Sequence, residues 1–149
     1  MTPWNAGVTL DAWTGLNSGD AITDLRQGTN QLINAPNKSV RQLDKLIGLY
    51  NDGDKYGTRI SGWLVSEACK DCQFFLYSDN AGEFWLSATD SPADKVLICN
   101  NLSATKRYHP CVSDYIHLDS GQAYYYEVSK NVRADILIKY CPHSSDLVV

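Results

Sequence analysis

The sequence predicts an all-β fold, an antiparallel β-sandwich with long loops and at most one short helix. From residue 58 onward, short segments rich in β-branched and aromatic residues alternate with turn residues about every eight to twelve positions, a spacing typical of sandwiches and barrels. The length of 149 residues and the hydrophobic content of 44% suffice for one core. No internal repeat or low-complexity linker divides the chain, so one domain is expected.

The first half of the chain is rich in turn residues and is expected to hold two short elements. Ala21–Leu25 favours a short strand. Within Val40–Leu49 the apolar residues Val40, Leu43 and Leu46 follow helical spacing, so a helix is predicted there. This short segment has weak caps and makes only a marginal helix, because helix nucleation is costly.

The strands of the sandwich are predicted mainly in the second half. In order along the chain they are Thr58–Val65, Gln73–Ser78, Glu83–Ser87, Lys95–Cys99, Tyr115–Leu118, Ala123–Val128 and Ile136–Tyr140. A short polar connection joins the first two, which predicts that they pair as a β-hairpin.

The aromatic residues divide into an expected core set and an expected surface set. Trp63 and Trp85 lie in the middle of predicted strands, so burial in the core is expected. Side chains alternate along a strand, so at least one of the three residues Tyr124–Tyr126 should be exposed. Three other aromatic residues are freer to stack on a sugar ring: Trp4, Tyr56 and Tyr108.

Charge and hydropathy exclude two classes of partner. Thirteen basic against seventeen acidic residues give a formal net charge of -4, which leaves no positive field for a phosphate backbone, so nucleic acid is not expected. No apolar run reaches the roughly 18 to 20 residues that a membrane-spanning helix needs, so no membrane insertion is expected.

Cysteines and glycosylation sequons together indicate an oxidising setting, that of a secreted protein or the ectodomain of a cell-surface protein. The five cysteines are Cys69, Cys72, Cys99, Cys111 and Cys141. Two sequons mark Asn37 and Asn101 as glycosylation sites.

Disulfides are the expected role of the cysteines. Cys69 and Cys72 form a CxxC that joins two predicted strands, whereas a thioredoxin-type motif opens a helix and a zinc site needs a second matching pair. Cys99 and Cys111 are expected to close the loop between them, which stabilises the fold by roughly 3 kcal/mol in the chain-entropy model. Cys69 and Cys72 could pair with each other and leave Cys141 odd, but the sequence does not decide the connectivity.

Several ordered segments carry a recognisable pattern. Asn51–Leu64 contains GDKYGTRISGWL, and Ser78–Ser87 has the sequence SDNAGEFWLS. Asp90–Ile98 has the sequence DSPADKVLI, and Leu118–Val128 has LDSGQAYYYEV. Together with the opening stretch Val8–Leu25, these segments resemble the protective-antigen (PA-fourteen) domain family, and most closely its fibrocystin-like branch.

The resemblance implies one PA-fourteen-type β-sandwich over residues 1–149. Its core spans about residues 8–141, with Met1–Gly7 and Pro142–Val149 as tails. Members of the family occur in toxins, glycosidases, glycosyltransferases, fungal adhesins and fibrocystin-type ectodomains, so the resemblance implies the fold more firmly than the function. In the glycosidases this fold is an accessory domain, so the chain is not expected to be an enzyme.

A calcium site is what the resemblance implies for Asp79 and Asn80. In adhesin members, two adjacent aspartates joined by a cis peptide hold a calcium ion that coordinates sugar hydroxyls. Here Asn80 replaces the second aspartate, which keeps an oxygen ligand but loses one charge. An asparagine from a later loop completes the family's site, so Asn131 and Asp135 are the further candidate metal ligands, with Asn131 and Arg133 as candidate ligand-binding residues.

Two other interpretations of acidic segments remain open. Asp79–Gly82 also fits a plain tight turn, because Asp, Asn and Gly are typical turn residues. Asn51–Asp54 lacks the spacing of a calcium-binding loop and is better explained as a turn, with Asp54 a candidate ion-pair partner for Arg59.

No catalytic arrangement is apparent in the sequence. His109, His117 and His143 have no neighbouring nucleophile and acid, so exposed positions are expected for them. Two functions are therefore weighed. The first is an extracellular module that binds a carbohydrate or another cell-surface ligand with the help of calcium. The second is a structural or protein-interaction domain, serving adhesion within a larger extracellular or receptor protein, with no small ligand. The sequence leaves the oligomeric state open.

Overall fold

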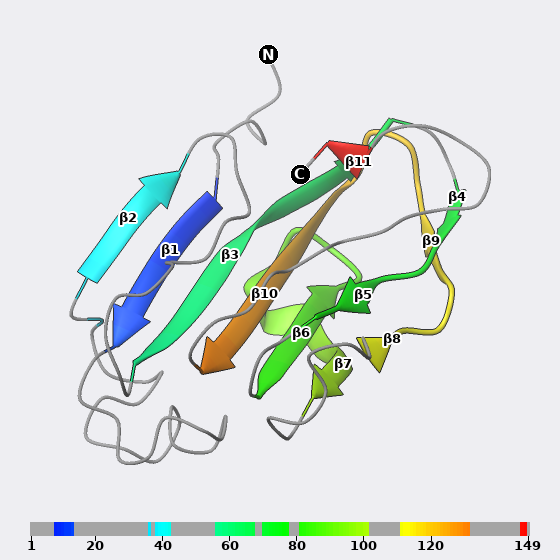
Figure 1. Ribbon diagram of the computed structural model, residues 1–149. Helices are drawn as coiled ribbons and strands as arrows, with labels where there is room; N and C mark the ends of the chain where they lie inside the picture. The colour runs from blue at the N-terminus through cyan, green and yellow to red at the C-terminus, as the bar shows by residue number, and fades with distance from the viewer. Residues whose placement is uncertain are drawn as a thin grey trace.

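The computed structural model describes residues 8–13, 36, 38–42, 56–67, 70–77, 81–101, 111–131 and 147–148. The elements in these ranges are strands apart from one 3-10 turn, which confirms the all-β prediction (Figure 1). They are β1 (Val8–Trp13), β2 (Lys38–Gln42), β3 (Gly57–Ser66), β4 (Lys70–Cys72), β5 (Phe75–Leu76), β6 (Gly82–Ser87), η1 (Pro92–Asp94), β7 (Lys95–Asn101), β8 (Cys111–Val112), β9 (Ile116–Leu118), β10 (Ala123–Asn131) and β11 (Leu147–Val148).

One large antiparallel sheet forms the first layer of the sandwich. Its strand order is β2-β1-β3-β10-β6-β7, and β11 also pairs with β3. Along β3, Thr9 of β1 lies opposite Ser61, and Val148 of β11 lies opposite Val65. Because β10 occupies the other edge of β3 along its length, β1 and β11 share one edge of this strand.

The second layer is made of two short antiparallel pairs. β4 pairs with β9 and β5 pairs with β8, and both pairs lie beside the β6–β7 side of the large sheet (Figure 1). The rings of Phe74 from the second layer and Phe84 from β6 meet with centroids 5.2 Å apart, so the two layers share one apolar core.

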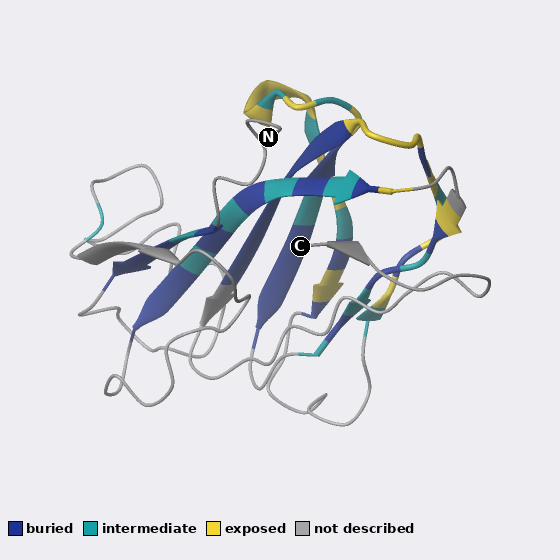
Figure 2. Cartoon of the chain, turned by 90° about the horizontal axis from the view of Figure 1, so that it is seen from above, coloured by how far each residue is buried: buried dark blue, intermediate teal, exposed yellow. Residues whose placement is uncertain are grey.

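The core follows from the alternation of side chains along the strands. On β3 the burial pattern alternates, so that Ile60 and Leu64 point inward while Arg59 and Trp63 do not (Figure 2). The inward residues of the other strands join them, namely Val8, Leu10, Phe84, Leu86, Tyr124, Tyr126 and Val128 from the large sheet and Cys72, Phe74, Leu76 and Leu118 from the second layer.

The predicted helix from Val40 is wrong where the structure describes it. Lys38–Gln42 is the edge strand β2, and Val40 lies opposite Leu10 of β1. Pairing with β1 outweighs a helical spacing that weak caps could not support. The remainder, Leu43–Leu49, lies outside the described residues, as do the predicted strands Ala21–Leu25 and Ile136–Tyr140.

The predicted hairpin between Thr58–Val65 and Gln73–Ser78 is also wrong. β3 is a central strand with β1, β10 and β11 at its edges, so no edge remains for the following segment. Phe75–Leu76 instead pairs with Cys111–Val112 in the second layer, and among the described residues of the predicted strand only these two belong to a strand. Within the described residues, no helix is long and apolar enough to cross a membrane.

Candidate functional site

The loop end of the large sheet, where β6 begins at Gly82 and β10 ends at Asn131, is the place of the predicted calcium site. Lys130 of β10 lies opposite Gly82, the first residue of β6, and Asn131 of β10 lies opposite Gly57 of β3. Asn131 therefore directly follows the residue that faces the start of β6. Asp79 and Asn80 precede β6 in the sequence but lie outside the described residues, as do Arg133 and Asp135. Of the residues predicted to bind calcium or a glycan, the structure therefore places Asn131 alone.

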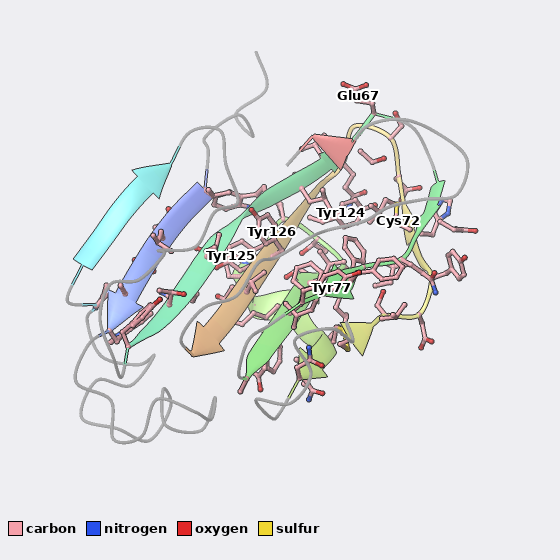
Figure 3. The ribbon with its side chains drawn as sticks, viewed as in Figure 1. Glu67, Cys72, Tyr77, Tyr124, Tyr125 and Tyr126 are labelled. Carbon is pink, nitrogen blue, oxygen red and sulfur yellow. A yellow bond between two sulfur atoms is a disulfide. The ribbon has the colours of Figure 1, made fainter. Side chains whose placement is uncertain are left out.

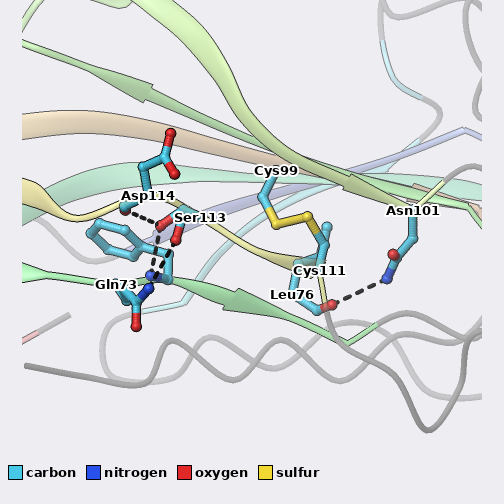
Figure 4. Close-up of a disulfide and its surroundings, with 8 residues drawn as sticks. Gln73, Leu76, Cys99, Asn101, Cys111, Ser113 and Asp114 are labelled. Atoms are coloured by element: carbon cyan, nitrogen blue, oxygen red, sulfur yellow. Dashed lines mark hydrogen bonds between the residues drawn. A yellow bond between two sulfur atoms is a disulfide. The ribbon is translucent and has the colours of Figure 1, made fainter.

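Asn101 lies at the same loop end, on β7, the strand that pairs with β6. It lies opposite Gly82 at the end of β7, it is 2% exposed, and its Nδ2 donates a hydrogen bond to the Leu76 carbonyl at 3.1 Å (Figure 4). The chain runs from Leu76 toward Asp79, so this buried amide fixes the backbone that leads into the predicted site.

The burial of Asn101 is at odds with its prediction as a glycosylation site. A glycan attaches to the side-chain nitrogen, and in the folded protein that atom is buried and already bonded to Leu76. The residues that follow, 102–110, lie outside the described residues, so glycosylation at Asn101 stays a prediction. Asn37 lies outside the described residues.

The disulfide between Cys99 and Cys111 is confirmed (Figure 4). It joins β7 of the large sheet to β8 of the second layer, so it fastens the two layers beside Asn101. The fully buried Cys72 is disulfide-bonded as well. Cys69 and Cys141 lie outside the described residues, so the pairing left open by the sequence stays open.

Among the described residues, no group of three or more His, Cys, Asp or Glu side chains lies close enough to hold a metal ion. Three of the four predicted calcium ligands, Asp79, Asn80 and Asp135, are outside those residues. Calcium therefore stays a prediction.

A second feature is a pocket between the layers, which we call the edge pocket. It has a volume of about 500 Å³, and it lies between the β6–β7 edge of the large sheet and the segment from Ser113 to Asp119. Its apolar walls are Leu86, Val96, Leu97, Ile98, Ile116 and Tyr124, and its polar lining is Ser87, Ser113, Asp114, His117 and Asp119. This volume is in the range of small-ligand and side-chain pockets.

The segment that forms one wall of the edge pocket is firmly attached to the second layer. Phe74 N–H donates to Ser113 Oγ at 2.9 Å, and Ser113 N–H donates to the Phe74 carbonyl, also at 2.9 Å (Figure 4). At its other end, Asp119 N–H donates to the Tyr124 hydroxyl at 2.7 Å. These bonds hold the wall in place without using the side chains of Asp114 or Asp119.

His117 lies on the rim of this pocket among carboxylates. Its Nδ1 is 2.7 Å from Asp71 Oδ1, directly across the β4–β9 pair, and its Nε2 is 3.6 Å from Asp119 Oδ1. The hydrogen bond to Asp71 raises the pKa of His117, and the negative charges of Asp71 and Asp119 add to the effect, which desolvation partly opposes. The predicted exposed position of His117 is confirmed.

The predictions for Trp63, Trp85 and Tyr56 are wrong, and the outer face of the large sheet explains the first two. Trp63 and Trp85 point to this face and are only half-buried, and their Nε1 atoms donate to the Asp90 carbonyl at 2.9 Å and to Glu83 Oε2 at 3.0 Å. They are not core residues, because a mid-strand position does not decide which face a side chain takes. Tyr56, predicted to be free for stacking, is 1% exposed.

The three labelled tyrosines follow one another along β10 (Figure 3). All three are buried, so alternation did not leave one exposed. Tyr125 takes the outer face, where its ring meets Trp63 edge-on with centroids 5.5 Å apart and its hydroxyl donates to Glu127 Oε1 at 2.8 Å. Burial and this hydrogen bond raise the pKa of Tyr125 above its ordinary range. The outer face is thus packed, not open to solvent, around Tyr125.

Charged groups on the outer face are paired within the sandwich. Arg59 Nη2 lies 2.8 Å from Asp11 Oδ2, and its guanidinium lies 5.4 Å from the ring centre of the buried Trp13. Lys95 Nζ lies 3.4 Å from Glu127 Oε1. Arg59 therefore has Asp11 as a partner, while Asp54, the partner considered from the sequence, lies outside the described residues.

The sequence-based reasoning missed the edge pocket altogether. A signal for it exists in Lys95–Cys99, because Val96, Leu97 and Ile98 form an uninterrupted apolar run where an edge strand with one solvent face would alternate. The polar rim gave no signal, because Asp114 and Asp119 resemble ordinary loop residues.

The comparison with curated proteins gives one partial relative. A segment of 78 residues is 32% identical to human Fibrocystin-L, and it makes up 50% of this chain but 2% of that protein. The chain thus corresponds to a small fraction of the relative it matches. No family model matches the chain.

The solved structures that are similar share the fold at low identity. The A domain of Epithelial Adhesin 6 from Candida glabrata, solved in complex with Galβ1-3GlcNAc, aligns with 91% of this chain and 77% of its own at 12% identity and a TM-score of 0.63. The corresponding domain of Epithelial Adhesin 9, with the same disaccharide, aligns with 99% of this chain and 88% of its own at 8% identity and a TM-score of 0.64. A β-glucosidase from Kluyveromyces marxianus aligns over 16% of its own chain, at 13% identity and a TM-score of 0.56.

Proposed function

We propose that the domain is an extracellular carbohydrate-binding module of the PA-fourteen type, and that it binds its glycan through a calcium ion at the loop end. The observation that carries the proposal is the likeness to two adhesin domains solved with a disaccharide, since it extends over 91% and 99% of this chain. The disulfide-bonded cysteines and the partial likeness to Fibrocystin-L support an extracellular setting.

The backbone at the loop end is suited to such a site. Asn131 ends β10 beside the start of β6, and Asp79 and Asn80 come directly before that start in the sequence. The buried Asn101–Leu76 hydrogen bond holds the chain that leads into the pair. Calcium accepts oxygen ligands from carboxylate, amide and sugar hydroxyl groups at flexible angles, which is the donor set that these residues and a glycan supply.

No reaction is part of this proposal. The similar β-glucosidase shares the fold over only 16% of its chain, which is the size of an accessory domain within a larger enzyme.

Calcium and glycan binding test the proposal on the purified domain. Calcium is expected to raise the melting temperature, because a ligand that binds the folded state stabilises it. Galβ1-3GlcNAc and a glycan array are the probes, and a chelator is expected to abolish the signal. Asp79→Ala should remove both effects, whereas Asn80→Asp should tighten calcium binding because it restores a charge.

Asp90→Ala is the matched control for Asp79→Ala. Asp90 is exposed, and its contact with Trp63 uses the backbone carbonyl, so the substitution removes a carboxylate without a described side-chain contact. The proposal fails if calcium changes neither the melting temperature nor glycan binding, or if Asp79→Ala behaves like Asp90→Ala.

A second function, protein interaction within a longer extracellular chain, is favoured by a different observation. The edge strand β7 exposes apolar side chains, with Val96 60% and Leu97 39% exposed. Exposed apolar residues that gather at one edge are typical of interaction sites.

A further inference from the structure

The edge pocket is a place where the core of the sandwich opens to solvent. Val96 lies opposite Leu86 in the β6–β7 register, so it points to the same inner face. Leu86 is 3% exposed but Val96 is 60% exposed, because the second layer does not cover the start of β7. The inner walls of the pocket are therefore core-like surface that no described residue fills.

The strand beside the pocket has an edge that no described strand pairs with. Among the described strands, β7 pairs with β6 only, and β8 of the second layer lies near its Cys99 end, where the disulfide joins them. Edge strands of this kind present a row of unpaired backbone N–H and C=O groups, which another extended chain can pair with. Val96 and Leu97 on this strand are exposed.

The rim of the pocket carries negative charge. Asp114 and Asp119 are exposed carboxylates on its lining, and their hydrogen bonds to the rest of the fold are made by backbone atoms. His117 lies between Asp119 and a third carboxylate, Asp71. An apolar cavity with such a rim is complementary to an apolar side chain that has a cationic group nearby.

We propose that the edge pocket binds an extended peptide segment of a partner protein, which adds to the large sheet along β7. One apolar side chain of the peptide, such as Phe or Leu, fills the pocket against Val96 and Leu86. Side chains two positions apart in a strand share a face, so a Lys or Arg two positions from this anchor reaches Asp114 and Asp119. The residue between them points to the other face of the added strand.

A peptide accounts for these features better than a small molecule does, because the free backbone edge of β7 is useful only to another backbone. The site is also separate from the proposed calcium site. The pocket lies at the Leu86–Ala88 end of β6 and the loop end lies at Gly82, which puts them about 15 Å apart at about 3.4 Å per residue. The two proposals can therefore fail independently.

A phage-displayed library of random ten-residue peptides tests the proposal on the complete chain. Selection on the wild-type protein is expected to enrich sequences with an apolar residue and a basic residue two positions apart. The best of these, made with a fluorescent label, should bind at least tenfold more weakly to Val96→Arg, which places a large cation in the pocket. Exchanging their basic residue for Glu, or combining Asp114→Asn with Asp119→Asn, should weaken binding at least threefold.

Val112→Arg is the matched control, because Val112 is another exposed valine, 47% exposed, that does not line the pocket. It should change peptide affinity less than twofold, and circular dichroism and melting should show that all variants are folded. On peptide binding, backbone amides of Lys95–Leu97 should gain protection from hydrogen exchange.

Three results would overturn the proposal. One is a selection that enriches no such pattern. Another is an enriched peptide that binds Val96→Arg as well as the wild type. The third is binding that leaves the β7 amides unprotected, which would mean that no strand is added. Loss of calcium or glycan binding in Asp79→Ala bears only on the loop end and leaves the peptide test unaffected.

Discussion

Two tyrosines on the same face of β10 differ in the hydrogen bonding of their hydroxyl groups. Tyr124 and Tyr126 both point into the core and are 4% and 0% exposed. The Tyr124 hydroxyl accepts a hydrogen bond from Asp119 N–H at 2.7 Å, whereas the buried Tyr126 hydroxyl has no hydrogen-bond partner among the described residues. A buried polar group without a partner lowers stability, and burial correspondingly raises the pKa of Tyr126 above its ordinary range.

Removing these two hydroxyls should therefore act in opposite directions. Tyr126→Phe is expected to raise the free energy of unfolding by about 1 kcal/mol, because it removes an unsatisfied polar atom and keeps the ring. Tyr124→Phe is expected to lower it by about 1 kcal/mol, because Asp119 N–H loses its partner. Urea unfolding of both variants measures the two effects, and changes of the same sign in both would contradict the hydrogen bonding described here.

His117 makes part of the stability dependent on pH. Its pKa is raised above the unfolded value of 6.5 by the hydrogen bond to Asp71, so the folded state holds the proton more tightly. The resulting stabilisation is complete below the unfolded pKa and disappears as the pH rises through the raised folded pKa.

The melting temperature difference between the wild type and Asp71→Asn should accordingly be largest in mildly acidic solution and vanish at alkaline pH. NMR titration of the His117 ring should give a lower pKa in Asp71→Asn than in the wild type. Asp94→Asn is a suitable control, because Asp94 interacts with Thr89 and not with the histidine. An unchanged His117 pKa in Asp71→Asn would show that the carboxylate is not the cause.

Among the elements, β7 and β8 show how one covalent bond joins two layers. β7 belongs to the large sheet and β8 to the second layer, and Cys99–Cys111 links them over a sequence separation of 12 residues. β8 has only two residues paired with β5, so few backbone hydrogen bonds hold it in place. Among the described residues, the disulfide and the Ser113–Phe74 bonds next to it add to its attachment.

The double variant Cys99→Ala/Cys111→Ala should lower the free energy of unfolding by about 2 to 4 kcal/mol, because it frees a closed loop in the unfolded chain. Guanidinium unfolding under oxidising conditions measures the loss while the disulfide of Cys72 stays intact. A loss below about 0.5 kcal/mol would mean that the loop is already constrained when the bond is absent.

The elements also show what local sequence can and cannot predict. Thr58–Val65, Glu83–Ser87 and Ala123–Val128 are strands as predicted, because β-branched and aromatic residues fit a pleated, half-buried surface. Which strands pair with each other was less predictable. Gln73–Ser78 follows β3 in sequence, yet its extended residues pair with β8, about 35 residues later, because both edges of β3 were already taken.

For the whole molecule, the resemblance to a known family predicted the class of fold correctly, while the sites were predicted unevenly. The Cys99–Cys111 bond was predicted as the closure of the loop between the two cysteines, and the structure confirms it. The apolar run in Lys95–Cys99 hints at the edge pocket but does not locate it, since the pocket depends on where the second layer ends. The burial of Tyr125 likewise depends on Trp63, a residue sixty-two positions earlier in the chain.

The two ends of the described fold meet on one strand, and this has a mechanical consequence. Thr9 lies opposite Ser61 and Val148 lies opposite Val65, on the same edge of β3. These attachment points are separated by four residues, about 14 Å at about 3.4 Å per residue. In a longer chain, the segments that lead into and out of the domain would lie close together. The domain could therefore be inserted into a loop of a host protein with little change in the course of the host's backbone. Tension along that chain would load the hydrogen bonds of β3 first, and would reach the loop end and the edge pocket only after the outer strands had peeled away.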